Sequence, residues 1–232
     1  GYAMANVDMA DITIYGVGGH GAYPHQAKDP IVLASKIVLA LQTIVSREID
    51  PLNPAVVTVG SIHGGSKHNI IPDEVRLQLT MRSYTDNVRE EIISKIKRII
   101  EGEAISLGIP KEKMPTLKLR DQYTPALYNT PEFVDQVVTN IEKSIGQENI
   151  FESKAVMGGE DFGRYGRVEP KIPTFLFWLG ASPVEVWEKS IRGEIDLPGI
   201  HSPFFAPDPL PTLKTGIKAM TAAAIGVFND NK

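Results

Sequence analysis

The sequence predicts an α/β protein whose first half has the ferredoxin-like split βαβ order of elements. Three observations support this prediction. Short segments alternate polar and apolar residues, as half-buried strands do. Two longer segments have apolar residues at helical spacing. Their order is strand–helix–strand–strand–helix–strand, which defines the split βαβ pattern. The 232 residues, 42% of them hydrophobic, suffice for one large domain or two modest ones.

The predicted elements of the first half lie between residues 9 and 119. Strands are expected over residues 9–16, 56–62, 74–83 and 116–119, and amphipathic helices over residues 29–47 and 87–106. Asp29 and Pro30 suit a helix N-cap and a first helical position. Pro51 and Pro54 prevent that helix from continuing.

The second half, after Thr124 and Pro125, has a different character. Helices are predicted over residues 131–145 and 210–228. The nearly all-apolar residues 174–179 are typical of a strand that is covered on both faces. One such strand is too little for an independent parallel-sheet domain. We therefore interpret this half as part of a domain whose other strands lie elsewhere.

Composition excludes several classes of function. The net charge of −4 argues against nucleic acid or an anionic membrane as the main partner, since both favour basic surfaces. No apolar run approaches the ~20 residues of a membrane-spanning helix. The absence of cysteine excludes disulfides, thiolate zinc sites and cysteine nucleophiles within the chain. No signal-peptide pattern precedes the first strand, so a cytoplasmic location is expected, although Gly1 indicates a processed or engineered start.

The five histidines are the first candidates for chemistry. His20 follows a predicted strand in a glycine-rich turn, where small neighbours let a ligand approach the backbone. The alternative is an exposed turn histidine without a role. His201 lies in a loop rich in proline and aromatic residues, where a neutral imidazole can be a metal ligand or a general base. A packed loop histidine is the alternative there. His25, His63 and His68 are interpreted as bystanders, and no pair has the spacing of a zinc-binding helix.

Polar residues near the third strand form a candidate carboxylate clamp. Arg82 lies on the polar face of that strand, and Asn69 stands thirteen residues before it. A guanidinium offers a bidentate fork and an amide adds a donor. A surface arginine and a turn asparagine are the alternative. Glu160 and Asp161, after two glycines, can act on a metal or a substrate amine, but such a pair is also a common helix N-terminus.

Six motifs occur in order along the chain: residues 18–25 (GGHGAYPH), Asp29-Pro30, residues 69–73 (NIIPD), Arg82, residues 159–162 (GEDF) and residues 201–205 (HSPFF). In this order and spacing they resemble the M20 family of metal-dependent peptidases and amidohydrolases. The branch they resemble most contains hippurate hydrolases, N-acyl-amino-acid amidohydrolases and auxin-conjugate hydrolases. No single motif is specific, but the ordered set covers essentially the whole chain.

The resemblance implies two domains. Residues 9–120 are similar to the ferredoxin-like lid, or dimerisation domain, which is inserted into a catalytic domain. Residues 121–232 are similar to the C-terminal part of that zinc-peptidase-like α/β catalytic domain. A homodimer formed through the lid is therefore expected.

The resemblance also implies roles for five residues. His201 matches a ligand of a two-metal centre. His20 matches a lid histidine that stabilises the reacting carbonyl in a neighbouring subunit. Asn69 and Arg82 match lid residues that bind the substrate, with the arginine holding its carboxylate. Glu160 lies in a family motif near the site and is a candidate for substrate binding.

The family's N-terminal catalytic segment, with most of the metal ligands and the general-base glutamate, has no match in this sequence. The resemblance implies that the whole enzyme uses two divalent ions, zinc or manganese, to polarise an amide carbonyl and activate water. Its products would include a free amino acid, released from an N-acyl amino acid or a small peptide. This chain alone, with only His201, is expected to bind metal weakly or not at all and to be inactive. The alternative function is a non-catalytic module that dimerises or binds a small acidic ligand.

Overall fold

The computed structural model describes residues 1–230, and the chain divides into two compact units. The sheet unit contains Tyr2–Tyr128 together with Ala155–Ile172. The helical unit contains Gly1, Asn129–Lys154 and the chain from Pro173 onward. The segment Ala155–Ile172 thus belongs to the sheet unit although it follows a helix of the other unit in the sequence.

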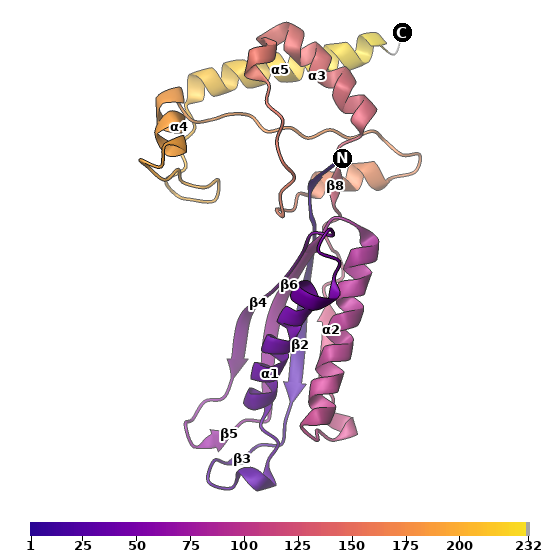
Figure 1. Cartoon of the computed structure of the whole chain (residues 1–232), viewed down its shortest axis with the longest axis vertical. Helices are drawn as coiled ribbons and strands as arrows, with labels where there is room; N and C mark the ends of the chain where they lie inside the picture. Colours follow the sequence, from indigo (N-terminus) through magenta and orange to yellow (C-terminus); the bar gives the residue numbers. More distant parts are fainter. Residues whose placement is uncertain (231–232) are drawn as a thin grey trace. The chain divides into compact units, whose positions relative to one another are not determined.

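The sheet unit is built on a four-stranded antiparallel sheet in the order β4-β6-β2-β7. Two helices cover one face of this sheet (Figure 1). In chain order the elements are β2 (Asn6–Tyr15), α1 (Pro30–Thr43), β4 (Ala55–Gly64), β6 (Glu74–Ser83), α2 (Asp86–Ser106) and β7 (Thr116–Leu119). This is the ferredoxin-like split βαβ arrangement, so the predicted fold class is confirmed.

Strand alternation explains why the core lies on one face. On β2, Ile12 and Ile14 are fully buried, and Ile12 is in register with Leu77 on β6. The intervening residues of β6, among them Arg76 and Gln78, are exposed on the open face. Successive side chains of a strand point to opposite faces, which fixes this division. The helix residues that fill the core are fully buried: Leu33, Ile37, Leu41, Ile92 and Ile96.

Helix α1 begins as the sequence predicts. The Asp29 carboxylate accepts hydrogen bonds from the N–H groups of Ile31 and Val32, and Pro30 is the first helical residue. The predicted helix over residues 29–47 is nevertheless two elements. The α-helix ends at Thr43, and a π-helical turn, η2 (Ile44–Glu48), continues it, with the Ile49 N–H donating to the Ile44 carbonyl at 2.9 Å.

The segment Pro30–Glu48 is long and apolar enough to cross a membrane by length and composition, contrary to the expectation from the sequence. It is the one helix of this kind among residues 1–230. Its Leu33, Ile37 and Leu41 side chains are fully buried in the core of the sheet unit. We therefore interpret the segment as a core helix, whose apolar character comes from packing against the sheet.

Several short elements were not predicted, because two or three residues carry no readable periodicity. The ribbon of β3 (Gly19–His20) and β5 (Ile70–Ile71) lies beyond one end of the four-stranded sheet (Figure 1). β1 (Tyr2–Met4) pairs with β8 (Leu127–Tyr128). The remaining 3-10 helices are η1 (Pro24–Gln26), η3 (Lys111–Lys113), η4 (Gln147–Asn149) and the longer η5 (Asp161–Arg167).

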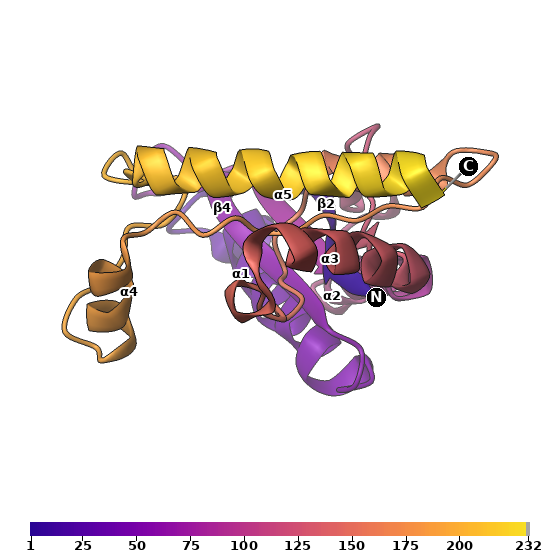
Figure 2. The same cartoon turned by 90° about the horizontal axis from the view of Figure 1, so that it is seen from above.

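The helical unit is centred on α3 (Pro131–Ile145) and α5 (Pro209–Asp230), which lie side by side (Figure 2). Val137 and Ile141 of α3 are buried in one cluster with Ala219 and Ala223 of α5. Both helices match the predicted segments closely, whereas α4 (Val184–Ile191) was not predicted.

The prediction of a strand over residues 174–179 is wrong. This segment pairs with no strand within residues 1–230. Its hydrogen bonds instead reach the segment before α3: the Leu176 N–H donates to Asn129 Oδ1 at 2.9 Å, and the Asn129 amide donates to the Leu176 carbonyl at 2.9 Å. An apolar run indicates burial, but a strand also requires a neighbouring strand.

Candidate functional site

The β3–β5 ribbon brings His20 and Asn69 together. His20 is in register with Ile70, and the Gly21 N–H donates to the Asn69 carbonyl at 2.8 Å. A Cβ atom at Gly21 would lie 3.1 Å from that carbonyl oxygen, so glycine permits the close approach. Two motifs that are far apart in the sequence therefore form one exposed structure, which we call the tip.

The His20 ring is oriented by its own turn. Its Nδ1 accepts a hydrogen bond from the Ala22 N–H at 3.1 Å, and the ring lies against Tyr23 with 5.7 Å between the centroids. In a neutral imidazole that accepts at Nδ1, the proton is on Nε2. The exposed His20 side chain thus offers Nε2 as a hydrogen-bond donor.

Asp73 joins the two motifs of the tip by hydrogen bonds. Its carbonyl accepts from the Gly16 N–H at 2.7 Å, and its carboxylate accepts from the Gly18 N–H at 3.1 Å. At Gly18 a Cβ would come within 2.9 Å of the Ile71 carbonyl oxygen. Gly18 therefore allows the backbone before His20 to pack closely against the segment that follows Asn69.

The structure separates Arg82 from the tip. Arg82 is at the opposite end of β6 from Glu74, which is next to the tip. At the strand rise of ~3.3 Å per residue, the stretch from Glu74 to Arg82 spans roughly 26 Å. Asn69 and Arg82 of one chain therefore do not form the carboxylate clamp that the sequence suggested.

Arg82 instead contacts the loop that carries Glu160. Its Nη1 donates to the Met157 carbonyl at 2.6 Å. The same loop is hydrogen-bonded to the start of the chain, where the Ala5 N–H donates to the Gly158 carbonyl at 2.8 Å. At Gly159 a Cβ would be only 2.3 Å from Cγ2 of Val7. We call residues 155–160 the glycine loop.

Glu160 caps the helical turn that follows the glycine loop. Its Oε1 accepts from the Asp161 N–H at 2.9 Å at the start of η5. This is the helix N-terminus that the sequence left open as an alternative. Arg82 and Glu160 thus belong to one region of the sheet unit, whereas His20 and Asn69 belong to another.

A network of charged residues beside η5 was not predicted from the sequence. Asp8 is 2% exposed on the inward face of β2 and accepts two hydrogen bonds from Arg89, at 2.6 and 2.8 Å. The Arg89 guanidinium lies 3.9 Å from the centroid of the Tyr123 ring. The hydrogen bonds with Asp8 raise the pKa of Arg89 above its ordinary value. The available signal was Asp8 itself, since an acidic residue at an inward strand position requires a cationic partner.

Arg167 of η5 binds Asp86, which begins α2. Its two Nη atoms donate to the two Asp86 oxygens at 2.6 and 3.1 Å. The hydrogen bonds with Arg167 hold the pKa of Asp86 below its ordinary value.

This ion pair makes part of the free energy of unfolding dependent on pH. A carboxyl whose folded-state pKa is lowered stabilises the fold above its unfolded pKa of ~3.9, and that contribution is lost as the pH falls through the folded value. We expect the difference in unfolding free energy between the chain and its Asp86→Asn variant to shrink between about pH 6 and about pH 2. Urea unfolding at both pH values measures it, and equal differences would contradict the expectation.

His201 lies in the helical unit, in an exposed turn closed by a hydrogen bond from the Ser202 N–H to the Gly199 carbonyl at 2.8 Å. Within residues 1–230 no group of three or more histidine, aspartate or glutamate side chains is placed to hold a metal ion. The donors of this chain alone therefore do not fit a two-metal centre.

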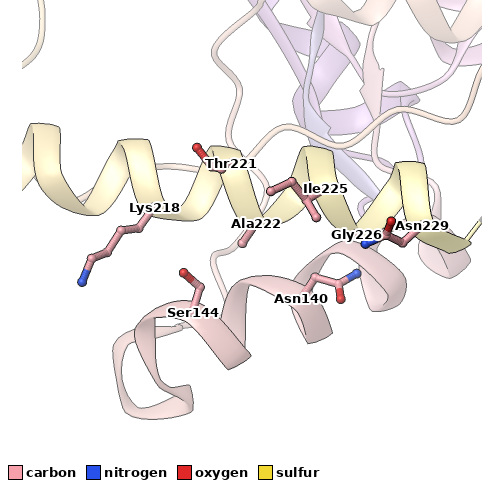
Figure 3. A pocket seen from close by; sticks show the side chains of 8 residues that line it. All are labelled: Asn140, Ser144, Lys218, Thr221, Ala222, Ile225, Gly226 and Asn229. Carbon is pink, nitrogen blue, oxygen red and sulfur yellow. The ribbon is translucent and has the colours of Figure 1, made fainter.

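A pocket of about 480 Å³ lies between α3 and α5 of the helical unit. Figure 3 shows Asn140 and Ser144 of α3 beside the α5 residues that line it. Its polar groups are amides, hydroxyls and the amine of Lys218, with no carboxylate or imidazole. None of the predicted site residues lines this pocket, and it offers neither a metal ligand nor a general base.

The sheet unit, with its ferredoxin-like sheet and exposed tip, has the architecture of a dimerisation domain of peptidases. Residues 2–107 match the M20 peptidase dimerisation domain, and the chain belongs to the M20 family.

Relatives with known names support this assignment. The chain is 37% identical over 183 residues to the N-acetyldiaminopimelate deacetylase of Leuconostoc mesenteroides, which covers 78% of this chain and 45% of that protein. It is 34% identical over 226 residues to the enzyme of that name from Bacillus licheniformis, covering 96% and 53%. Thermostable carboxypeptidase 2 of Saccharolobus solfataricus is 37% identical over 180 residues, covering 78% and 43%. The chain spans about half the length of these relatives.

Two solved structures share the fold. A provisionally assigned aminohydrolase from methicillin-resistant Staphylococcus aureus has a TM-score of 0.75 and 30% identity, covering 97% of this chain and 51% of that one. A dinuclear metal-binding M20 peptidase from Bacillus subtilis has a TM-score of 0.65 and 22% identity, covering 98% and 51%. At that identity the second likeness concerns the fold alone.

Proposed function

We propose that this chain is the lid and the C-terminal part of a metal-dependent M20 amidohydrolase. The whole enzyme hydrolyses the amide bond of an N-acyl amino acid or a small peptide and releases a free amino acid. The observation that carries the proposal is the tip, where the paired motifs bring the exposed residues His20 and Asn69 onto neighbouring strand segments. The relatives' names, deacetylase and carboxypeptidase, support amide hydrolysis.

Each predicted residue has a role that its surroundings permit. His20 donates from Nε2 to the carbonyl oxygen as negative charge develops there, and the amide of Asn69 binds the substrate beside it. Arg82 uses Nη1 for the Met157 carbonyl, which leaves other N–H groups of its guanidinium for a substrate carboxylate. Glu160, in the same region, contacts the substrate as well.

The metal centre requires more than this chain supplies. We assign His201 as one ligand of two divalent ions, zinc or manganese, and the other ligands to the part of the enzyme that this chain does not span. When bound, these ions polarise the amide carbonyl and activate water. The chain alone is therefore proposed to be inactive and to hold metal weakly or not at all.

We further infer a homodimer formed by the side of the sheet unit that carries β4 and α1. β4 is an edge strand of ten residues, and α1 packs against it. The exposed residues of α1 include three large apolar ones, Leu39 at 73%, Val32 at 48% and Ile31 at 43%, and none that is charged. In contrast, the outward residues of α2 are mostly charged: Glu90, Glu91, Lys97, Arg98 and Glu101. An unpaired strand edge next to an apolar helix face favours symmetric pairing.

The dimer also accounts for the separation of the site residues. The tip and Arg82 of one chain are roughly 26 Å apart along β6. One active site therefore cannot use the tip and Arg82 of the same chain. We propose that the tip of one subunit completes the site of its partner. We also place the enzyme in the cytoplasm, acting on a small molecule and not on nucleic acid or membrane.

The Leu39→Glu variant is expected to be monomeric, because a carboxylate at the centre of the proposed interface must lose its hydration without a partner. Sedimentation equilibrium of the chain measures this. Ile105→Glu is the matched control, since Ile105 is similarly exposed, at 64%, but lies on α2. Dissociation of the control and not of Leu39→Glu would place the interface on the other side of the sheet unit.

The full-length protein, with the segment that this chain lacks, tests the proposed function. After loading with zinc or manganese it is expected to hydrolyse members of a panel of N-acyl amino acids and dipeptides, while this chain does not. His201→Ala is expected to lower both the metal content and the rate. A metal-loaded full-length protein that is inert toward the whole panel would leave the alternative, a non-catalytic dimerisation or ligand-binding module.

A further inference from the structure

The glycine loop and η5 are fixed to the sheet unit at both ends by arginine side chains. Arg82 holds Met157, before Glu160, and Arg167 holds Asp86, after it. We propose that the Arg167–Asp86 pair is a positioning device that presents the Glu160 carboxylate to the substrate, so that Glu160 and Arg82 act as one substrate-binding unit. This inference rests on the proposed function and adds residues that the sequence motifs did not indicate.

The anchor after Glu160 is geometrically well defined. Arg167 and Asp86 form a bidentate pair, with N–O distances of 2.6 and 3.1 Å, and such pairs fix orientation as well as distance. Arg167 Nη1 also donates to the Tyr123 hydroxyl at 3.3 Å. One turn earlier, Arg164 donates to the Tyr123 carbonyl at 2.7 Å. Both arginines of η5 therefore contact the segment that leaves β7.

The backbone contact beneath η5 leaves no room for a side chain at Gly163. A Cβ at Gly163 would lie 2.9 Å from the Ala126 carbonyl oxygen and 3.0 Å from that of Pro125. Gly163 is buried, so the turn rests directly on the backbone of that segment. The loop before Glu160 is flexible by composition, because Gly158 and Gly159 are adjacent. It is held at Met157 by Arg82 and at Gly158 by the Ala5 N–H.

Between these two anchors, the two carboxylate oxygens of Glu160 differ in their hydrogen bonding. Its Oε1 caps η5 by accepting from the Asp161 N–H at 2.9 Å. Its Oε2 accepts no hydrogen bond from the part of the chain that the structure describes. A carboxylate oxygen of a residue held in this way is suited to a hydrogen-bond donor of the substrate, such as an amide N–H.

A double-mutant cycle in the full-length enzyme tests this role. Arg167→Gln and Glu160→Gln are each expected to raise KM roughly tenfold with little change in kcat, and the double variant is expected to raise it no further than Glu160→Gln alone. Arg167→Lys, which keeps the charge but not the fork, is expected to restore KM in part. Arg192→Gln is the matched control, because Arg192 binds Glu194 at 2.6 Å in the helical unit.

Hydrogen exchange of residues 155–168 in the present chain provides a readout without catalysis. Arg167→Gln is expected to speed exchange there, and Arg192→Gln is not. Unchanged exchange would overturn the anchoring. Faster exchange with an unchanged KM, or KM effects that multiply in the double variant, would reduce the pair to a structural role while the proposed function stands. A full-length enzyme without activity would overturn the proposed function and the positioning role with it, whereas the anchoring would still be decided by exchange.

Discussion

Replacing Arg89 with alanine is expected to lower the free energy of unfolding of this chain by about 3–5 kcal/mol. The Asp8 carboxylate, only 2% exposed, would lose both of its hydrogen bonds to the guanidinium. A buried charge without a partner costs far more than the pair contributes when both members are present. The loss of the contact between Arg89 and the Tyr123 ring adds to the effect. Urea unfolding followed by far-ultraviolet circular dichroism measures it.

Two variants make this expectation specific. Arg98→Ala removes an ion pair with Glu48 that is exposed on the surface of α2, and it is expected to cost at most about 1 kcal/mol. The double variant Asp8→Leu with Arg89→Met, which removes both charges, is expected to be more stable than Arg89→Ala. Equal costs for Arg89→Ala and Arg98→Ala would show that the burial of Asp8 does not matter.

Replacing His20 with alanine in the full-length dimer is expected to lower kcat by about 10²–10³-fold, the usual cost of losing one donor to a developing oxyanion. The affinity for substrate is expected to change much less, because the donor acts mainly in the transition state. His25→Ala is the matched control. His25 is exposed in η1 of the same tip, and its loss is expected to leave kcat nearly unchanged.

Mixed dimers show in which subunit His20 acts. A chain with His20→Ala and a chain with His201→Ala each form inactive homodimers under the proposal. Random mixing is expected to restore roughly a quarter of the native activity, because half of the dimers are mixed and each has one intact site. No recovery, with mixed dimers verified by mass, would mean that His20 serves its own subunit.

The fold of the sheet unit could be predicted because its strands and helices leave a periodic signal. The alternation through Leu77 and Leu79 on β6, and the cap at Asp29, are local features that the structure retains. Residues 174–179 show the limit of such signals. Their hydrophobicity predicted a strand covered on both faces, whereas Trp178 is 51% and Leu179 is 40% exposed. Whether such residues form a strand depends on neighbours that no local pattern reveals.

The candidate site residues stay predictions, but the structure groups them differently from the sequence analysis. His20 and Asn69 meet because two short strands pair, and a pairing of two residues is too brief to detect. Asn69 and Arg82 were grouped because they are close in sequence, although ten residues of extended β6 keep them apart. Arg89 and Arg167 were missed because each acts on a distant carboxylate. The inward position of Asp8 was a signal for Arg89, its partner.

The length of the extended strand β6 fixes a distance within the sheet unit. It has the Glu74 end at the tip and Arg82 at the other end, so its residue count sets the spacing between the two regions. Inserting one residue would turn Arg82 from the open face into the core, because side chains alternate. Only changes of two residues preserve the face, and each would alter the spacing by about 7 Å. The length of β6 can therefore change the spacing between these two regions of the sheet unit only in coarse steps.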